Sequence, residues 1–94
     1  MVTAIIVMNV ERGKINEVAE ALADLEGISE VYSVSGSHDL VAIARVASNE
    51  KLSALVTRQM QKLESIQKTE TMLALQTYSR HALESMFSIG LDGA

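Results

Sequence analysis

Apolar and polar residues follow two different periods along the chain, and each switch between them marks an expected element. Residues 2–10 (VTAIIVMNV) form a β-branched run that ends at Glu11-Arg12-Gly13, which is typical of a buried strand followed by a turn. From Lys14 to Glu26 the apolar residues recur every three or four positions, which predicts an amphipathic helix. Gly27 then stands at the expected helix end, because a residue without Cβ adopts positive φ at little cost.

The same two periods return in the rest of the chain. Residues 28–35 and 39–47 are strand-like runs whose connection, Gly36-Ser37-His38, is short enough for an antiparallel hairpin. Ser48 or Asn49 can serve as the N-cap of a second helix, and residues 66–78 return to strand composition. This order predicts an α+β, ferredoxin-like βαββαβ fold (an α/β plait) with a four-stranded antiparallel sheet.

The end of the chain predicts one further element. Leu83, Met86 and Phe87 fall on one side of a short C-terminal helix, which at about three turns is marginal alone and has to dock on its own domain or on a neighbouring protomer. We therefore expect a ferredoxin-like ligand-binding domain over residues 1–79 and a short helical tail over residues 80–94.

The predicted sheet has more apolar surface than two helices can cover. Runs 2–10 and 39–47, the expected central strands, are apolar on both faces: Ile5 and Val7 lie on one face of the first, and Val41 and Ile43 on one face of the second. Two helices on one side cover a single face. An extensive apolar face is rarely left in water, so the sequence predicts a homo-oligomer that packs sheet against sheet.

Composition narrows the classes of partner. The 94 residues suffice for one domain, and the net charge is −4, with eight Lys and Arg residues scattered singly. No basic stripe exists to neutralise phosphates, so nucleic acid is a poor partner. The chain has no Cys and no apolar run long enough to span a bilayer, so we expect a cytoplasmic location and no membrane contact.

No arrangement of residues predicts catalysis or a cofactor. Ser37, His38 and Asp39 are consecutive, so in an extended chain they point to alternate faces and cannot form a triad. His38 and His81 are the only histidines; we expect both to be exposed, and no metal site follows from them. A phosphate-binding glycine loop is also missing. We therefore expect a protein that is not an enzyme, with no catalytic residues, no metal and no cofactor.

The hairpin connection Ser35-Gly36-Ser37-His38-Asp39 carries the strongest local indication of a ligand. Glycine permits backbone conformations that gather successive N–H groups into a concavity for an anion, and Asp39 adds an acceptor beside it. Amide donors beside a carboxylate suit a zwitterion such as a free α-amino acid. Gly, Ser and Asp also dominate ordinary turns, so a plain hairpin turn remains open from these residues alone.

Several segments together resemble a known family. They are Val10-Glu11-Arg12-Gly13, Val18-Ala19-Glu20-Ala21-Leu22, Gly27-Ile28, Val34-Ser35-Gly36-Ser37-His38-Asp39-Leu40 and Lys68-Thr69-Glu70-Thr71. From about Thr3 to Tyr78 the chain resembles the effector-binding (RAM) domain of the Lrp/AsnC regulators. The resemblance places a Gly-x-x-Asp pattern at Gly36 to Asp39 and implies six ligand-binding residues: Gly36, Ser37, His38, Asp39, Thr69 and Thr71.

The resemblance also implies an assembly: a dimer formed through the sheets, often in a ring of dimers, with an amino acid or related metabolite bound where dimers meet. Two departures matter. The first strand begins at residue 2, so we expect a stand-alone domain without a helix-turn-helix and without direct DNA binding. His38 stands where an aromatic residue is common, and the glycine usual just before Ile66 is missing, so the ligand's identity does not carry over.

Three functional hypotheses follow. The first is a stand-alone amino-acid-binding and oligomerisation module that acts as a metabolite sensor or co-assembles with full-length regulators. The second is a small dimeric ferredoxin-like enzyme of the cofactor-free monooxygenase type, for which Asn9 is the single candidate residue in a pocket between sheet and helices. The third is an ACT-type amino-acid-binding regulatory domain.

Overall fold

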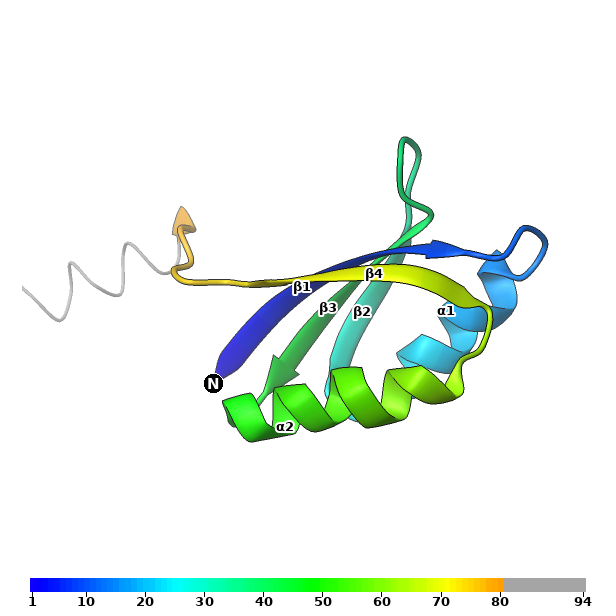
Figure 1. Ribbon diagram of the computed structural model, residues 1–94. Helices are drawn as coiled ribbons and strands as arrows, with labels where there is room; N and C mark the ends of the chain where they lie inside the picture. Colours follow the sequence, from blue (N-terminus) through cyan, green and yellow to red (C-terminus); the bar gives the residue numbers. More distant parts are fainter. Residues whose placement is uncertain (81–94) are drawn as a thin grey trace, which may run out of the picture.

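A computed structural model describes residues 1–80 of the chain, and its element order confirms the predicted βαββαβ fold (Figure 1). The elements are β1 (Val2–Val10), α1 (Ile15–Ala23), β2 (Ile28–Ser33), β3 (Leu40–Val46), α2 (Asn49–Ala54), η1 (Leu55–Gln59), η2 (Met60–Lys62) and β4 (Ile66–Leu73). The second predicted helix is thus three consecutive segments, because α2 widens into the π-helical η1 and tightens into the 3-10 turn η2.

The sheet has the strand order β2-β3-β1-β4, and every neighbouring pair is antiparallel. β1 and β3 pair in the centre, from Val2 opposite Val46 to Met8 opposite Leu40. β2 and β4 form the edges, as predicted. Both helical segments lie on the same side of the sheet (Figure 1), so residues 1–80 place no covering layer on its other face.

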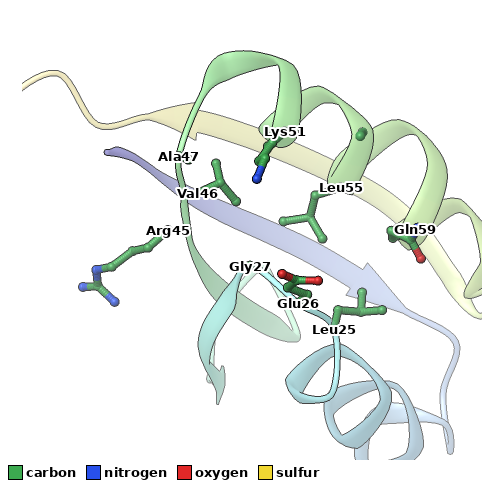
Figure 2. Close-up of a pocket in the computed structure, with 10 residues that line it drawn as sticks. Leu25, Glu26, Gly27, Arg45, Val46, Ala47, Lys51, Leu55 and Gln59 are labelled. Carbon is green, nitrogen blue, oxygen red and sulfur yellow. The ribbon is translucent and has the colours of Figure 1, made fainter.

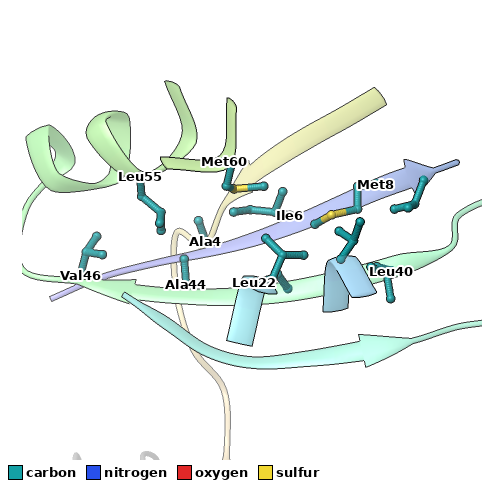
Figure 3. Packing of buried hydrophobic residues seen from close by; sticks show 12 residues of the cluster. Ala4, Ile6, Met8, Leu22, Leu40, Ala44, Val46, Leu55 and Met60 are labelled. Carbon is teal, nitrogen blue, oxygen red and sulfur yellow. The ribbon is translucent and has the colours of Figure 1, made fainter. Parts of the chain in front are cut away.

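The hydrophobic core lies between the sheet and the helices (Figure 3). On the central strands β1 and β3, every second side chain is buried on this side, because side chains alternate between the two faces of a strand. Ile6, Met8, Leu22 and Leu40 are the largest fully buried side chains. The buried residues of the cluster are Ala4, Ile6, Met8, Val10, Val18, Leu22, Leu40, Ala42, Ala44, Val46, Leu55 and Met60.

The opposite face of the sheet, here called the open face, is apolar in the middle and charged at its edges. Its centre consists of Ile5, Val7, Val41 and Ile43, all partly exposed. The register adds Thr3, Asn9, Arg45, Glu30, Tyr32, Lys68, Glu70 and Met72 from the surrounding positions. The predicted two-sided apolar character of the central strands is therefore confirmed.

Local chemistry sets where the helices begin and end. Gly27 has φ +98°, and a Cβ at this position would lie 2.9 Å from Val46 Cγ1, so glycine is required both for conformation and for space. At the start of α2 the Ser48 Oγ accepts a hydrogen bond of 3.2 Å from the Lys51 N–H. Ser48 is therefore the N-cap, one of the two residues that the sequence offered.

The last strand is shorter than predicted. β4 ends at Leu73 and not at residue 78, because β1 offers no further partner: the Ala74 N–H donates to the Thr3 carbonyl (2.9 Å), and β1 begins one residue earlier. Beyond that point Leu75 and Tyr78 are 91% and 74% exposed. The predicted tail helix over 80–94 falls almost wholly on residues 81–94, outside the described part of the chain.

Candidate functional site

The turn between β2 and β3, residues 34–39, is closed by a backbone hydrogen bond from the Val34 N–H to the Asp39 carbonyl (3.1 Å). Gly36 has φ +111°, in the region that favours glycine. A Cβ placed on Gly36 would meet nothing within 4 Å. Glycine is thus needed here for the backbone conformation and not for room.

Three hydrogen bonds attach this turn to the end of β1. The Asp39 N–H donates to the Met8 carbonyl (2.9 Å), and Asp39 Oδ2 accepts from the Val10 N–H (2.8 Å). Asn9 Nδ2 donates to the Ser37 carbonyl (2.9 Å). Because bonds from three consecutive residues of β1 fix the turn, its shape is set by the fold before any ligand arrives.

These bonds change the interpretation of Asp39. The sequence suggested a carboxylate that is available to a ligand, but one of its oxygens satisfies the backbone N–H of Val10. Within residues 1–80 the other oxygen, Oδ1, has no hydrogen-bond partner. Asp39 therefore holds the turn and keeps one oxygen free as an acceptor.

Backbone donors of the turn are available. Among the described residues, the N–H groups of Gly36, Ser37 and His38 have no hydrogen-bond acceptor, and Gly36 and Ser37 are exposed. Consecutive amide donors of this kind are able to bind an anionic group such as a carboxylate. The turn therefore offers both donors and an acceptor at one place.

His38 differs from expectation. Its side chain is only partly exposed, and its Nδ1 atom is buried without a hydrogen-bond partner in the described structure. The expected exposure of His38 is therefore wrong, because the exposure of this residue depends on long-range hydrogen bonds that attach the turn to β1 and that turn chemistry alone does not predict. His81 lies outside the described residues.

The two threonines implied by the resemblance lie on β4. Thr69 is opposite Met8 and Thr71 opposite Ile6 in the β1–β4 register, and both are exposed. Since β1 lies between β3 and β4 in the sheet, it also lies between the turn and the threonines within one chain. The structure thus brings the four turn residues together and places the threonines on the other side of a strand.

A cleft of about 540 Å³ lies at the opposite end of the β2–β3 hairpin (Figure 2). It is lined by Leu25, Glu26, Gly27, Arg45, Val46, Ala47, Lys51, Ala54, Leu55 and Gln59. Sequence reasoning identified Gly27 only as a helix end and missed the cleft. Its lining includes the charged residues Glu26, Arg45 and Lys51, which are distant in sequence, and only the fold brings them to one cleft.

The Tyr32 hydroxyl donates to Glu30 Oε2 (2.6 Å) on the open face, and this hydrogen bond raises the pKa of Tyr32 above its ordinary value of 10.0.

No group of three or more His, Cys, Asp or Glu side chains within residues 1–80 is arranged to hold a metal ion. None of the helices in this range is both long and apolar enough to cross a bilayer.

Comparison with known proteins decides the family. The model of the Lrp/AsnC ligand binding domain matches residues 3–83. The chain belongs to this family. This Lrp/AsnC domain is 34% identical over 70 residues to an uncharacterised HTH-type transcriptional regulator of Pyrococcus furiosus, and the match covers 74% of the domain and 47% of the regulator. The chain thus spans about half the length of the curated relatives it matches, which are named as transcriptional regulators and not as enzymes.

Solved structures agree on the fold. TTHA0845 from Thermus thermophilus superposes with a TM-score of 0.80 at 39% identity, over 85% of this Lrp/AsnC domain and 100% of that chain. The regulator NMB0573 from Neisseria meningitidis, solved as a complex with L-Met, has a TM-score of 0.75 at 14% identity, over 84% of the domain and 53% of that chain. The family and the ferredoxin-like fold expected from the sequence are therefore confirmed.

Proposed function

We propose that this Lrp/AsnC domain binds a free α-amino acid or a related small metabolite at the turn 34–39 and self-associates through its open face. Binding shifts the assembly state, so the domain serves as a metabolite sensor, alone or in co-assembly with full-length regulators through the same face. The observation that carries the proposal is the turn itself, a loop attached to β1 by three hydrogen bonds, with free amide donors beside a carboxylate oxygen.

The charges of the turn support a zwitterionic ligand. The N–H groups of Gly36, Ser37 and His38 suit the ligand carboxylate, and Asp39 Oδ1 suits its ammonium group. A protein of the same fold, the Neisseria regulator NMB0573, is described as a complex with L-Met. An amino acid is therefore the first class of ligand to test.

The open face supports self-association. Its partly exposed centre, Ile5, Val7, Val41 and Ile43, forms one apolar surface across β1 and β3. A second copy that packs on this surface removes it from water without disturbing the core on the other face. In a larger assembly Thr69 and Thr71 of a neighbouring copy would complete the pocket at the turn, since β1 keeps them apart from it within one chain.

Thermal denaturation in the presence of single amino acids tests the proposed ligand class. A ligand at 100 times its Kd adds about 2.7 kcal/mol to the stability of the folded state, which is readily seen as a rise in Tm. The double variant Thr69→Val, Thr71→Val should lose this rise, because it removes the two hydroxyl groups and keeps the shape.

The matched control is Thr77→Val, the same change at an exposed position beyond β4, and it should respond like the parent protein. If no amino acid raises the Tm of the parent chain, the proposed ligand class is wrong. If the double variant responds as the parent does, the threonines are not part of the site.

The position of Asn9 argues against the monooxygenase alternative. That hypothesis needed Asn9 in a pocket between sheet and helices, but Asn9 alternates with the buried Met8 and Val10 and so lies on the open side of β1. Its amide also donates to the Ser37 carbonyl. The family match likewise favours the Lrp/AsnC domain over the ACT-type alternative.

A further inference from the structure

The cleft described above is distinct in position from the turn. Ile28 at the start of β2 pairs with Ala44, and Ser33 at its end pairs with Leu40. Gly27 and Val46 therefore lie at one end of the β2–β3 hairpin and the turn 34–39 at the other. A ligand in the cleft would not contact the turn of the same chain.

The inner surface of the cleft is apolar and closely packed. Val46 and Leu55 belong to the core, at 8% and 3% exposure, and Leu25 packs against it. Gly27 brings the backbone directly onto these side chains, since an added Cβ would lie 2.9 Å from Val46 Cγ1 and 3.5 Å from Leu55 Cδ2. The Arg45 N–H also donates to the Gly27 carbonyl (2.8 Å) and fixes this wall to β3.

Two opposite charges border this apolar surface. Figure 2 shows Lys51 extending from α2 and Glu26 from the α1–β2 connection toward the opening, while the Arg45 guanidinium points away. Arg45 is engaged with Glu30, its Nη1 lying 3.6 Å from Oε1. In the described structure Glu26 and Lys51 form an ion pair neither with each other nor with a third residue.

This charge arrangement selects among ligand classes. A simple anion attracted by Lys51 is repelled by Glu26, and a simple cation attracted by Glu26 is repelled by Lys51. A zwitterion satisfies both: its ammonium group pairs with Glu26 and its carboxylate with Lys51, while an aliphatic side chain lies on Leu25 and Leu55. The volume of about 540 Å³ is within the range of small-molecule sites.

We propose that the cleft between the α1–β2 connection, the end of β3 and α2 is a second binding site, for a zwitterionic α-amino acid with an apolar side chain. Glu26 and Lys51 hold the two charged groups, and Gln59 lies on the rim as a further hydrogen-bonding group. This site is independent of the function proposed for the turn, and either one stands if the other fails.

Backbone amide NMR of the full chain tests the site residue by residue. L-norleucine is titrated beside its decarboxylated analogue, pentylamine, and its deaminated analogue, hexanoate. We expect L-norleucine to shift the amide signals of Gly27, Ala47 and Leu55, with each analogue binding about tenfold more weakly or worse because it lacks one charged contact. Equal binding of all three compounds would overturn the zwitterion assignment.

Variants separate the charged contacts from general effects. Glu26→Gln and Lys51→Gln should each weaken binding of L-norleucine about tenfold or more, whereas the same changes outside the cleft, Glu20→Gln and Lys62→Gln, should leave it unchanged. All four positions are exposed, and the spectra themselves report whether each variant is folded. Unchanged affinity in both cleft variants would overturn the proposal.

The same spectra distinguish the two sites. Shifts at Gly27, Ala47 and Leu55 that persist in the Thr69→Val, Thr71→Val double variant support the cleft, whatever happens at the turn. Shifts confined to Gly36 through Asp39 overturn the cleft and leave the function proposed for the turn intact. The cleft proposal is also overturned if L-norleucine, up to its solubility limit, shifts no amide signal at the cleft.

Discussion

At the scale of single residues, Gly13 and Gly27 allow conformational strain to be separated from lack of space. Both have φ near +90°, at +89° and +98°, but an added Cβ meets nothing within 4 Å at Gly13 and lies 2.9 Å from Val46 Cγ1 at Gly27. Gly13→Ala should lower the free energy of unfolding by about 1–3 kcal/mol through strain alone. Gly27→Ala should lower it further, because the methyl group also displaces a core side chain. Urea denaturation checks both, and equal losses would mean that Val46 moves aside freely.

Asp39 gives a second prediction at this scale. Asp39→Ala leaves the partly buried Val10 N–H without its acceptor and should cost about 1–3 kcal/mol of stability. Asp39→Asn keeps an oxygen at the same place and should cost less. Urea denaturation measures both losses, and hydrogen exchange at Val10 reports the bond itself. Equal losses in the two variants would show that the charge and not the hydrogen bond fixes the turn.

Tyr32 gives a prediction about pH. The hydrogen bond that its hydroxyl donates to Glu30 raises the pKa of Tyr32, with smaller contributions in the same direction from desolvation and from the charge of Glu30. A raised folded-state pKa means that the bond stabilises the fold below pH 10.0 and that this contribution is lost as the pH rises through the folded-state pKa. In Glu30→Ala the pKa of Tyr32 should fall towards 10.0, as followed by NMR of the ring carbon that bears the hydroxyl. Glu26→Ala removes a carboxylate elsewhere, and a similar fall in that control would contradict the assignment.

At the scale of elements, the second helix depends on Ser48, the residue that caps its start. Ser48 Oγ accepts from the Lys51 N–H, and α2 keeps regular α-helical geometry only as far as Ala54 before it widens into η1. Ser48→Ala should therefore destabilise the domain by about 0.5–2 kcal/mol, whereas Ser48→Asp supplies another acceptor and should retain stability. Thermal denaturation compares them with Ser53→Ala, a change within the same helix that removes no cap. A loss in Ser53→Ala as large as that in Ser48→Ala would contradict the capping role.

Elements also show how far the sequence alone was sufficient. The β-branched run 2–10 coincides with β1 at both ends. A central strand is recognised from its own apolar residues, so its bounds could be predicted from the sequence. Residues 74–78 continue the alternation of β4, yet they form no strand, since a strand also needs a partner and β1 begins at Val2, one residue before the Thr3 that bonds to Ala74. The widening of the second helix at η1 leaves the spacing of its apolar residues intact and was not predicted.

The candidate site, too, could be predicted only in part from the sequence. Gly, Ser and Asp at 36–39 predicted a turn that is able to hold a ligand, because turn chemistry is local. The bonds from Asn9 and Val10 that fix it span 28 and 29 residues, and the cleft between Glu26 and Lys51 likewise depends on the packing of α2 against the hairpin. Neither was visible in sequence, since contacts of this range exist only after the sheet has formed.

At the scale of the whole molecule, residues 1–80 cover only one face of the sheet. The core side is closed by α1, α2 and the segments that follow, whereas the open face presents the partly exposed Ile5, Val7, Val41 and Ile43. A substitution on the open face can therefore change association without creating a cavity in the core. Because the open face and the core are separate, a single substitution on the open face can test the proposed assembly.

Val7→Lys is the variant that uses this separation. Val7 is opposite Glu70 on β4, so a lysine there gains a cross-strand partner of opposite charge and the isolated domain should remain folded. In an association of two open faces, however, the same lysine would be buried at the centre of an apolar interface, which is strongly unfavourable. Sedimentation velocity should therefore show a dimer or larger assembly for the parent chain and a folded monomer for Val7→Lys. Ala23→Lys adds the same charge at an exposed position of α1 and should assemble like the parent. A parent chain that sediments as a monomer at all concentrations would contradict the assembly, together with any pocket that requires residues from two copies.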